Sequence, residues 1–266
     1  MDTIGIFLLP FDKAVISRPG ARFAPFKIKE LLLKLNFKNK EKIKFFELNL
    51  ENYDTYKAHN FITNFINENK DHKFFIFIGG DHSITYATFK ALKSVYNNLF
   101  LINIDKHFDI RDWSIDNISS GCSFSRLLDE KIISPSDLLE IGILEFYNNE
   151  KLFQKAEHYG FEYIRMMELK KNFDKFLELF KKKIEGVEYI YLSFDIDVMD
   201  ISVCPGSSAN SPFGLNSYEL IKIFDLILET KKLIAIDIVE VNPIFDFDDM
   251  TSKFCAFLIA YILNQL

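Results

Sequence analysis

Short apolar segments alternate with longer amphipathic segments along most of this chain. Residues 98–104 and 189–194, for example, are dominated by aliphatic and aromatic side chains. Such runs, bounded by polar or turn-forming residues, are typical of strands that are buried on both faces of a parallel sheet. The pattern predicts strands at residues 4–9, 42–48, 73–78, 98–104, 137–143, 161–165, 189–194 and 233–239.

Between these strands, apolar residues recur every three or four positions, which is the spacing of an amphipathic helix. In residues 167–184 the spacing continues without a break, so we expect one long helix there. The alternation of strands and helices predicts an α/β fold, with a mostly parallel sheet covered by helices on both faces. No linker or repeat interrupts it, so we expect a single domain spanning residues 1–266. The expected helices are 25–35, 56–67, 84–96, 124–129, 150–159, 167–184, 218–230 and 250–266.

Composition and charge narrow the class of protein. The net charge of −6 argues against a nucleic-acid binder, which usually carries a basic face. No apolar run reaches the ~18 residues that a membrane helix needs, and Met1-Asp2-Thr3 lacks the basic start of a signal sequence. Cys122, Cys204 and Cys255 are widely spaced and show no paired pattern, so we expect a reduced, cytoplasmic setting.

Metal-competent side chains follow the ends of several expected strands. Asp105, His107 and Asp109 come directly after residues 98–104 and are spaced two apart. In extended backbone, alternate side chains point to the same face, so these three groups should converge. Ligands of open α/β sheets bind outside the carboxyl ends of the strands, which is where this cluster is expected.

Three other strands are followed by similar groups. His82 follows residues 73–78 in a Gly-Gly-Asp-His-Ser segment, Asp195 and Asp197 follow residues 189–194, and Glu240 follows the last strand. Each cluster alone is more often a turn or a helix cap. Together, four carboxylates near one sheet edge would repel one another strongly, so a bound metal is the economical explanation.

Two imidazoles and four carboxylates are too many ligands for one tetrahedral zinc ion, and they suit a pair of divalent ions with bridging carboxylates. Mn²⁺, Fe²⁺ and Zn²⁺ all accept such mixed ligands. A metal pair lowers the pKa of a bridging water, so that hydroxide is available near neutral pH. The remaining histidines, His59, His72 and His158, lie in polar surroundings, and we expect them at the surface.

These motifs together resemble those of the ureohydrolase family, which includes arginases, agmatinases and formimidoylglutamases. The resemblance covers nearly the whole chain and implies a three-layer α/β/α fold, with a central eight-stranded parallel sheet. It also implies two Mn²⁺ ions and an assembly of trimers or hexamers. The segments that carry it are residues 17–23, 79–83, 105–109, 193–200 and 237–243.

The resemblance also implies a role for each site residue. Asp105 and Asp195 would bridge the two ions, and the bridging hydroxide would attack an amidine or guanidine carbon. Asp109 would accept a hydrogen bond from that hydroxide, and Glu240 would bind the cationic amidinium of the substrate. The implied ligands are His82, Asp105, Asp109 and Asp195 for one ion, and His107, Asp105, Asp195 and Asp197 for the other.

Within the family, two loops resemble those of the formimidoylglutamase branch. Residues 119–128 lack the histidine that arginases and agmatinases carry there, and residues 204–215 are similar to the formimidoylglutamase segment. This branch hydrolyses N-formimidoyl-L-glutamate to L-glutamate and formamide, a step of histidine breakdown. Its substrate has two carboxylates, which require cationic partners. The candidates are Arg111, Arg126 and Arg18.

Several positions depart from the family pattern and leave two rival hypotheses open. Lys106 replaces a small residue and should point away from the metal-facing side, into a packed layer where its ammonium must pair or reach solvent. Leu144-Glu145 replaces a usual Arg-Asn pair. The first rival is an agmatine or guanidino-acid hydrolase that releases urea. The second is a metal-binding subunit of a hetero-oligomer without catalytic activity.

Overall fold

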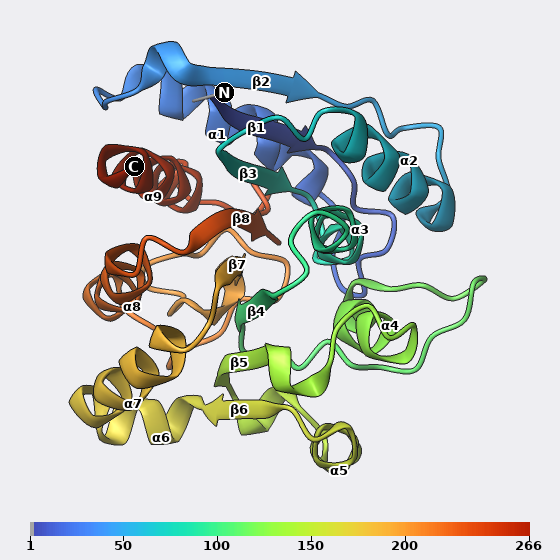
Figure 1. Cartoon of the computed structure of the whole chain (residues 1–266), viewed down its shortest axis with the longest axis vertical. Coiled ribbons are helices and arrows are strands. Elements are labelled where there is room, and N and C mark those ends of the chain that lie inside the picture. The colour runs from blue at the N-terminus through green and yellow to red at the C-terminus, as the bar shows by residue number, and fades with distance from the viewer. Residues whose placement is uncertain (1–2) are drawn as a thin grey trace.

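The computed structural model describes residues 3–266 and contains one eight-stranded sheet in which every strand pair is parallel (Figure 1). Met1 and Asp2, on which the expected lack of a signal sequence partly rests, lie outside the described residues. The strand order is β2-β1-β3-β8-β7-β4-β5-β6. The strands are β1 (Ile4–Leu9), β2 (Ile43–Glu47), β3 (Phe74–Gly79), β4 (Leu99–Ile104), β5 (Leu138–Ile143), β6 (Glu162–Arg165), β7 (Tyr189–Asp195) and β8 (Leu233–Val239).

Helices cover both faces of the sheet, as the alternating pattern predicts. On one face, apolar side chains of α1, α6, α7, α8 and α9 join one buried cluster, and those of α2, α3, α4 and α5 form a second cluster on the other face. The three-layer α/β/α fold is therefore confirmed. The helices are α1 (Ala24–Lys34), α2 (Thr55–Glu68), α3 (Ile84–Lys93), α4 (Ser123–Asp129), α5 (Glu150–Tyr159), α6 (Met166–Lys171), α7 (Phe173–Glu185), α8 (Ser217–Glu229) and α9 (Met250–Gln265).

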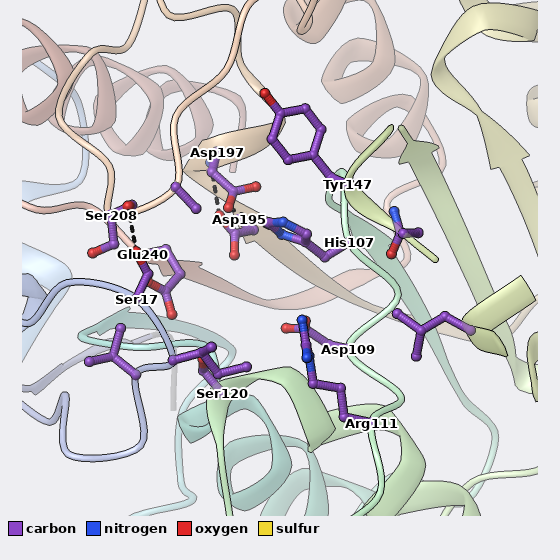
Figure 2. A pocket seen from close by; sticks show the side chains of 15 residues that line it. Ser17, His107, Asp109, Arg111, Ser120, Tyr147, Asp195, Asp197, Ser208 and Glu240 are labelled. Carbon is purple, nitrogen blue, oxygen red and sulfur yellow. Dashed lines mark hydrogen bonds and ion pairs between the residues drawn. The ribbon is translucent and has the colours of Figure 1, made fainter. Parts of the chain in front are cut away.

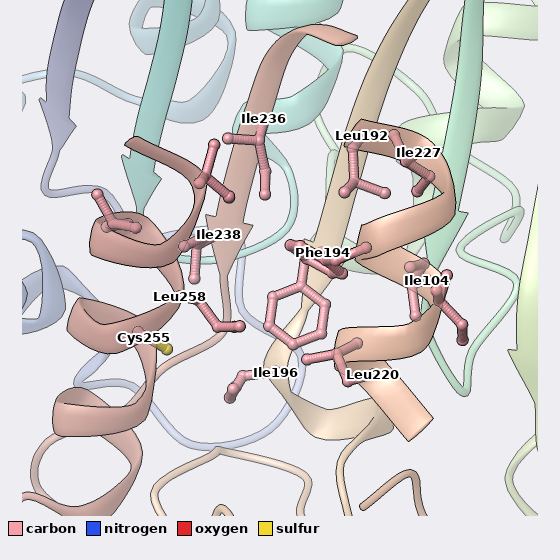
Figure 3. Close-up of a cluster of buried hydrophobic side chains, with 14 of the residues drawn as sticks. Ile104, Leu192, Phe194, Ile196, Leu220, Ile227, Ile236, Ile238, Cys255 and Leu258 are labelled. Carbon is pink, nitrogen blue, oxygen red and sulfur yellow. The ribbon is translucent and has the colours of Figure 1, made fainter. Parts of the chain in front are cut away.

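The centre of the sheet is packed with large aliphatic and aromatic side chains. Ile236 and Ile238 of β8 and Phe194 of β7 point towards α8 and α9, where they meet Leu220 and Leu258 (Figure 3). All five side chains are fully buried. This packing holds β7 and β8 rigidly, so the polar residues that follow these strands start from a defined position.

The expected helix at 167–184 is wrong in one respect, because it is two helices. α6 ends at Lys171 and α7 begins at Phe173. Between them, Asn172 has φ −149° and ψ 68°, which is outside the helical region, and its side chain accepts a hydrogen bond from the backbone N–H of Lys175. Apolar spacing continues across the break, so periodicity alone did not reveal it.

The sheet order brings together strands that are far apart in the chain. The four neighbours β3, β8, β7 and β4 lie at the centre, and each is followed by at least one candidate site residue. Because parallel strands end at the same sheet edge, the segments after these strands meet at one place. In the part of the chain that the structure describes, no helix is both long and apolar enough to cross a bilayer.

Candidate metal centre

His82 lies at the centre of one half of the site, where it faces three carboxylates. Its Nδ1 is 2.9 Å from Asp109 Oδ2, 3.2 Å from Asp105 Oδ2 and 3.3 Å from Asp195 Oδ2. The His82 side chain is 1% exposed, and Asp105 is completely buried. Four groups from the ends of three strands thus converge on a space that a small cation can fill.

His107 forms the other half of the site. Its Nδ1 is 3.3 Å from Asp197 Oδ2 and 3.5 Å from Asp105 Oδ1. Asp105 therefore lies between the two histidines. Its Oδ2 faces His82, and its Oδ1 faces His107. Such a shared carboxylate is what two neighbouring ions require. The candidate ligand atoms form two groups, and within each group they lie within 4.8 Å of one another. The first group is His82, Asp105 and Asp109, and the second is Asp105, His107 and Asp197.

Several of these atoms have no hydrogen-bond partner. His82 Nδ1, Asp105 Oδ2 and Asp197 Oδ1 are buried and unpaired, although carboxylates surround the imidazole closely. A buried polar atom without a partner costs about 1–3 kcal/mol, or more when it is charged. A divalent cation coordinated by these atoms would remove that cost. The residues present therefore fit a metal pair, and their oxygen and imidazole chemistry suits Mn²⁺.

A hydrogen-bond chain orients the His82 ring. Its Nε2 is 3.0 Å from Ser193 Oγ, which donates a hydrogen bond of 2.7 Å to Asp237 Oδ1. Asp237 also accepts hydrogen bonds from Thr85 and Tyr191. With Nε2 engaged behind the site, Nδ1 is left to face the carboxylates, as in many metal-binding histidines.

Local backbone contacts orient the carboxylates in the same way. The backbone N–H of His107 donates to Asp105 Oδ1 at 2.7 Å, and that of Asp197 donates to Asp195 Oδ1 at 2.8 Å. Each contact spans two residues and is a local turn-like interaction. As a result, Oδ2 of each carboxylate points to His82.

Burial and charge change the pKa values strongly when no cation is present. Burial raises the pKa of Asp195 well above its usual range, and the neighbouring carboxylates of Asp197 and Asp105 raise it further. Burial opposes the charged form of His82, but the close carboxylates of Asp105, Asp109 and Asp195 outweigh it and raise its pKa well above the usual value.

Glu240 reaches the site from the end of β8. Its Oε1 accepts a hydrogen bond of 2.8 Å from the backbone N–H of His82, and its own N–H donates to the carbonyl oxygen of Gly80. Burial, followed by the charges of Asp195 and Asp81, raises the pKa of Glu240 well above its usual range. Its φ of 61° lies in the left-handed region, which is uncommon for a residue other than glycine. Backbone strain of this kind concentrates at functional sites.

A cavity of about 120 Å³ opens beside these groups (Figure 2). Arg111 lies at its wall together with Asp109, and Tyr147 lies at its rim near His107. Sequence reasoning missed most of the other wall residues. Ser17, Ser120, Ser208 and Ala209 lie in segments that resemble the family, whereas the other wall residues carry no motif. These additional lining residues are Val15, Ile16, Ser17, Ser120, Tyr147, Asn148, Leu152, Ser208 and Ala209.

The structure separates the three candidate arginines. Only Arg111 of the three is among the residues that line this cavity. Arg18 donates from Nε to the carbonyl oxygen of Ser208 at 3.1 Å, and its guanidinium lies 3.9 Å from the centre of the Phe245 ring. Arg18 therefore supports the Ser208 wall from behind.

Arg126 is buried away from the cavity wall and pairs with His59. Its Nη1 is 2.8 Å from His59 Nδ1, and its guanidinium lies 3.5 Å above the Tyr86 ring. The expectation that His59 lies at the surface is wrong, because this residue is 1% exposed and its Nε2 contacts Ser83 at 3.0 Å. The polar sequence around His59 belongs to the outer face of α2, whereas His59 lies on the inner face. His72 is partly buried and His158 is exposed.

Lys106 is also buried, with a side chain that is 1% exposed. As expected, its ammonium is paired. The expectation that it points away from the metal-facing side is wrong, because Nζ lies 3.9 Å from Asp197 Oδ2. The long lysine side chain is able to bring its charge to a candidate ligand.

Comparison with known proteins identifies the family. The family model described as the arginase family matches residues 2–264. Formimidoylglutamase of Bacillus subtilis (strain 168) is 30% identical over 272 residues, which cover 97% of this chain and 85% of the relative. The crystal structure of formimidoylglutamase from Bacillus subtilis subsp. subtilis str. 168 has a TM-score of 0.91 at 28% identity, and covers 100% of this chain and 87% of that chain. Trypanosoma cruzi formiminoglutamase with Mn²⁺ shares the fold, with a TM-score of 0.88 at 20% identity over 99% of this chain and 93% of that chain. On these grounds, the chain belongs to the arginase family.

Proposed function

We propose that this protein is a Mn²⁺-dependent hydrolase that converts N-formimidoyl-L-glutamate to L-glutamate and formamide. The observation that carries the proposal is the convergence of two imidazoles and four carboxylates beside a cavity that Glu240 and Arg111 also line. Relatives at about 30% identity bear the name formimidoylglutamase, which supports the choice of substrate.

Six side chains would hold the metal pair. When bound, the two ions would supply a water of lowered pKa as the nucleophile and would stabilise developing negative charge. The choice of Mn²⁺ is supported by the ligand chemistry and by the Mn²⁺ in the crystal structure of Trypanosoma cruzi formiminoglutamase. One ion would be held by His82, Asp105, Asp109 and Asp195, and the other by His107, Asp105, Asp195 and Asp197.

The other side chains would orient the substrate. The Glu240 carboxylate would accept hydrogen bonds from the planar, cationic amidinium and hold its carbon next to the nucleophile. Arg111 would bind a substrate carboxylate at the cavity wall. Asp109 would accept a proton from the attacking water, and the nitrogen that leaves as the amine of L-glutamate requires one proton. The new C–O bond would form first and make the carbon tetrahedral. The proton held by Asp109 would then pass to the glutamate nitrogen, the C–N bond to that nitrogen would break, and formamide would be the second product.

The proposal also covers the setting of the protein. A reducing, cytoplasmic compartment is supported by three buried free cysteines. The chain would form a single domain spanning residues 1–266 and would assemble into a homo-oligomer such as a trimer or hexamer. Its reaction would be a step of histidine breakdown. Neither a nucleic acid nor a membrane would be a partner, since the net charge is −6.

One substrate panel tests this proposal against its rivals. The Mn²⁺-reconstituted protein is incubated with N-formimidoyl-L-glutamate, agmatine, arginine and guanidino acids, and formamide and urea are measured separately. Formamide from the first substrate supports the proposal. Urea from any guanidine would support an agmatine or guanidino-acid hydrolase instead. No product from any substrate, with two ions bound, would favour a non-catalytic metal-binding protein.

A further inference from the structure

Lys106 links one half of the metal centre to the wall of the cavity. Its Nζ donates hydrogen bonds to the carbonyl oxygen of Ala209 and, at 3.2 Å, to Ser211 Oγ. The same atom lies 3.9 Å from Asp197 Oδ2 and 4.6 Å from the centre of the Tyr147 ring. A protein cation is thus held by several fixed contacts beside one candidate ligand.

The Lys106 ammonium lies close to the carboxylate of only one of the two candidate metal positions, the one at His107. Asp197 Oδ2 also faces His107 Nδ1 at 3.3 Å, so Lys106 approaches the carboxylate that serves the His107 position. The carboxylates that face His82 are those of Asp105, Asp109 and Asp195, and Asp197 is not among them. Charges that are buried are poorly screened by solvent and salt.

We propose that the Lys106 ammonium partly neutralises Asp197 and repels a divalent ion at the His107 position, so that this position binds metal more weakly than the His82 position. The inference rests on the metal pair of the proposed function but not on the identity of the substrate. Lys106 contacts Ala209 and Tyr147 of the cavity wall, but it does not itself line the cavity and touches no reacting atom. It is a positioning residue that sets the order in which the two ions bind.

The test measures metal binding directly. The full-length protein is freed of metal with a chelator, and Mn²⁺ is titrated by calorimetry. The wild type should show two affinity classes. Lys106→Met retains the length of the side chain and removes the charge, and it should tighten the weaker class by about tenfold or more while leaving the tighter class unchanged. In electron paramagnetic resonance, the spin-coupled signal of the Mn²⁺ pair should appear at a lower ratio of metal to protein.

A purely structural role for Lys106 predicts the opposite direction. Loss of its contacts would loosen Asp197 and the 209–211 segment, so metal binding would weaken or stay the same, and either result would overturn the inference. Lys155→Met is the matched control, because Lys155 pairs with Asp112 at 2.5 Å and its loss changes the net charge equally. This variant should keep both wild-type affinities.

Two further readings keep the inference separate from the proposed function. If Lys106→Met fails to fold, Lys106→Gln retains a donor and lacks the charge, and it should show the same tightening. Equal affinities at two sites in the wild type would overturn the inference without any variant. If the wild type bound no Mn²⁺ at all, the metal centre of the proposed function would fail as well. Retention of two Mn²⁺ ions without tightening in the variant would overturn only the role of Lys106.

Discussion

The carboxylate of Glu240 accepts a hydrogen bond of 2.8 Å from the backbone N–H of His82, which ties the end of β8 to the loop after β3. One carboxylate oxygen is thereby fixed, and the side chain still lines the cavity. Glu240 is thus held beside the candidate metal ligands without belonging to the proposed ligand set. This arrangement separates the binding of substrate from the binding of metal, and mutation can test that separation.

Glu240→Gln should lower kcat/KM while both ions remain bound. The variant loses the charge that would pair with the amidinium, and a hydrogen bond to a charged group contributes about 1.5–3 kcal/mol, which is roughly tenfold to a hundredfold. Steady-state kinetics and metal analysis of the same sample measure the two effects. Loss of metal in this variant would contradict the separate role of Glu240.

Asp195→Ala should abolish both metal occupancy and turnover, because this carboxylate would bridge the two ions. It should also remove the stabilisation by Mn²⁺, which for one ion is about 2.7 kcal/mol at a concentration one hundred times Kd. Metal analysis and thermal unfolding with and without Mn²⁺ provide the measurements. Asp112→Ala, at a side chain that is 98% exposed, is the control. Full activity of Asp195→Ala would refute the dinuclear site.

Arg111→Ala should raise KM for N-formimidoyl-L-glutamate about tenfold or more, because a substrate carboxylate would lose its charged partner. The stability of the fold should change little. Kinetics with the diacid substrate and with an amidine that lacks carboxylates provide the test. An equal effect on both substrates would show that Arg111 does not recognise a carboxylate.

Arg126→Ala should lower the stability of the fold and should leave the KM for the substrate unchanged. It leaves the buried Nδ1 of His59 without its hydrogen-bond partner and the Tyr86 ring without the guanidinium, and a buried polar atom left unpaired costs about 1–3 kcal/mol. Chemical denaturation measures the free energy of unfolding. Arg165→Ala is the control, since its ion pair with Glu145 is partly exposed and should contribute at most about 1 kcal/mol. A normal stability and a raised KM in Arg126→Ala would return Arg126 to the substrate-binding set.

His59 should make the fold sensitive to acid. Burial, followed by the charge of Arg126, lowers its pKa from 6.5 to about 3. Between pH 6.5 and about 3, His59 therefore binds a proton in the unfolded chain but not in the folded chain. As a result, this residue lowers the free energy of unfolding as the pH falls from 6.5 towards 3. The slope from one such group is about 1.4 kcal/mol for each pH unit.

His59→Asn removes this titration. Its free energy of unfolding, relative to that at pH 7.5, should fall less steeply than in the wild type between pH 6.5 and 4. His158→Asn, at an exposed position, is the control and should follow the wild type. Parallel pH profiles for the wild type and His59→Asn would contradict the lowered pKa.

The sequence by itself determined the α/β class, the strands and the types of side chain in the candidate metal centre. These features depend on local rules: buried parallel strands are continuous apolar runs, and side chains two apart in extended backbone share a face. Asp105, His107 and Asp109 could be recognised together because one short segment contains all three. The family resemblance rested on the same kind of local motif, and the comparisons confirm it.

Only the tertiary structure decided what depends on neighbours distant in the chain. The order β3-β8-β7-β4 places Glu240 between the segments of His82 and Asp195, although β8 is the last strand. Long-range packing also buries His59 against Arg126 and brings Lys106 to Asp197. A side chain's charge and length are written in the sequence, but its surroundings are set by the packing of elements that no local pattern connects.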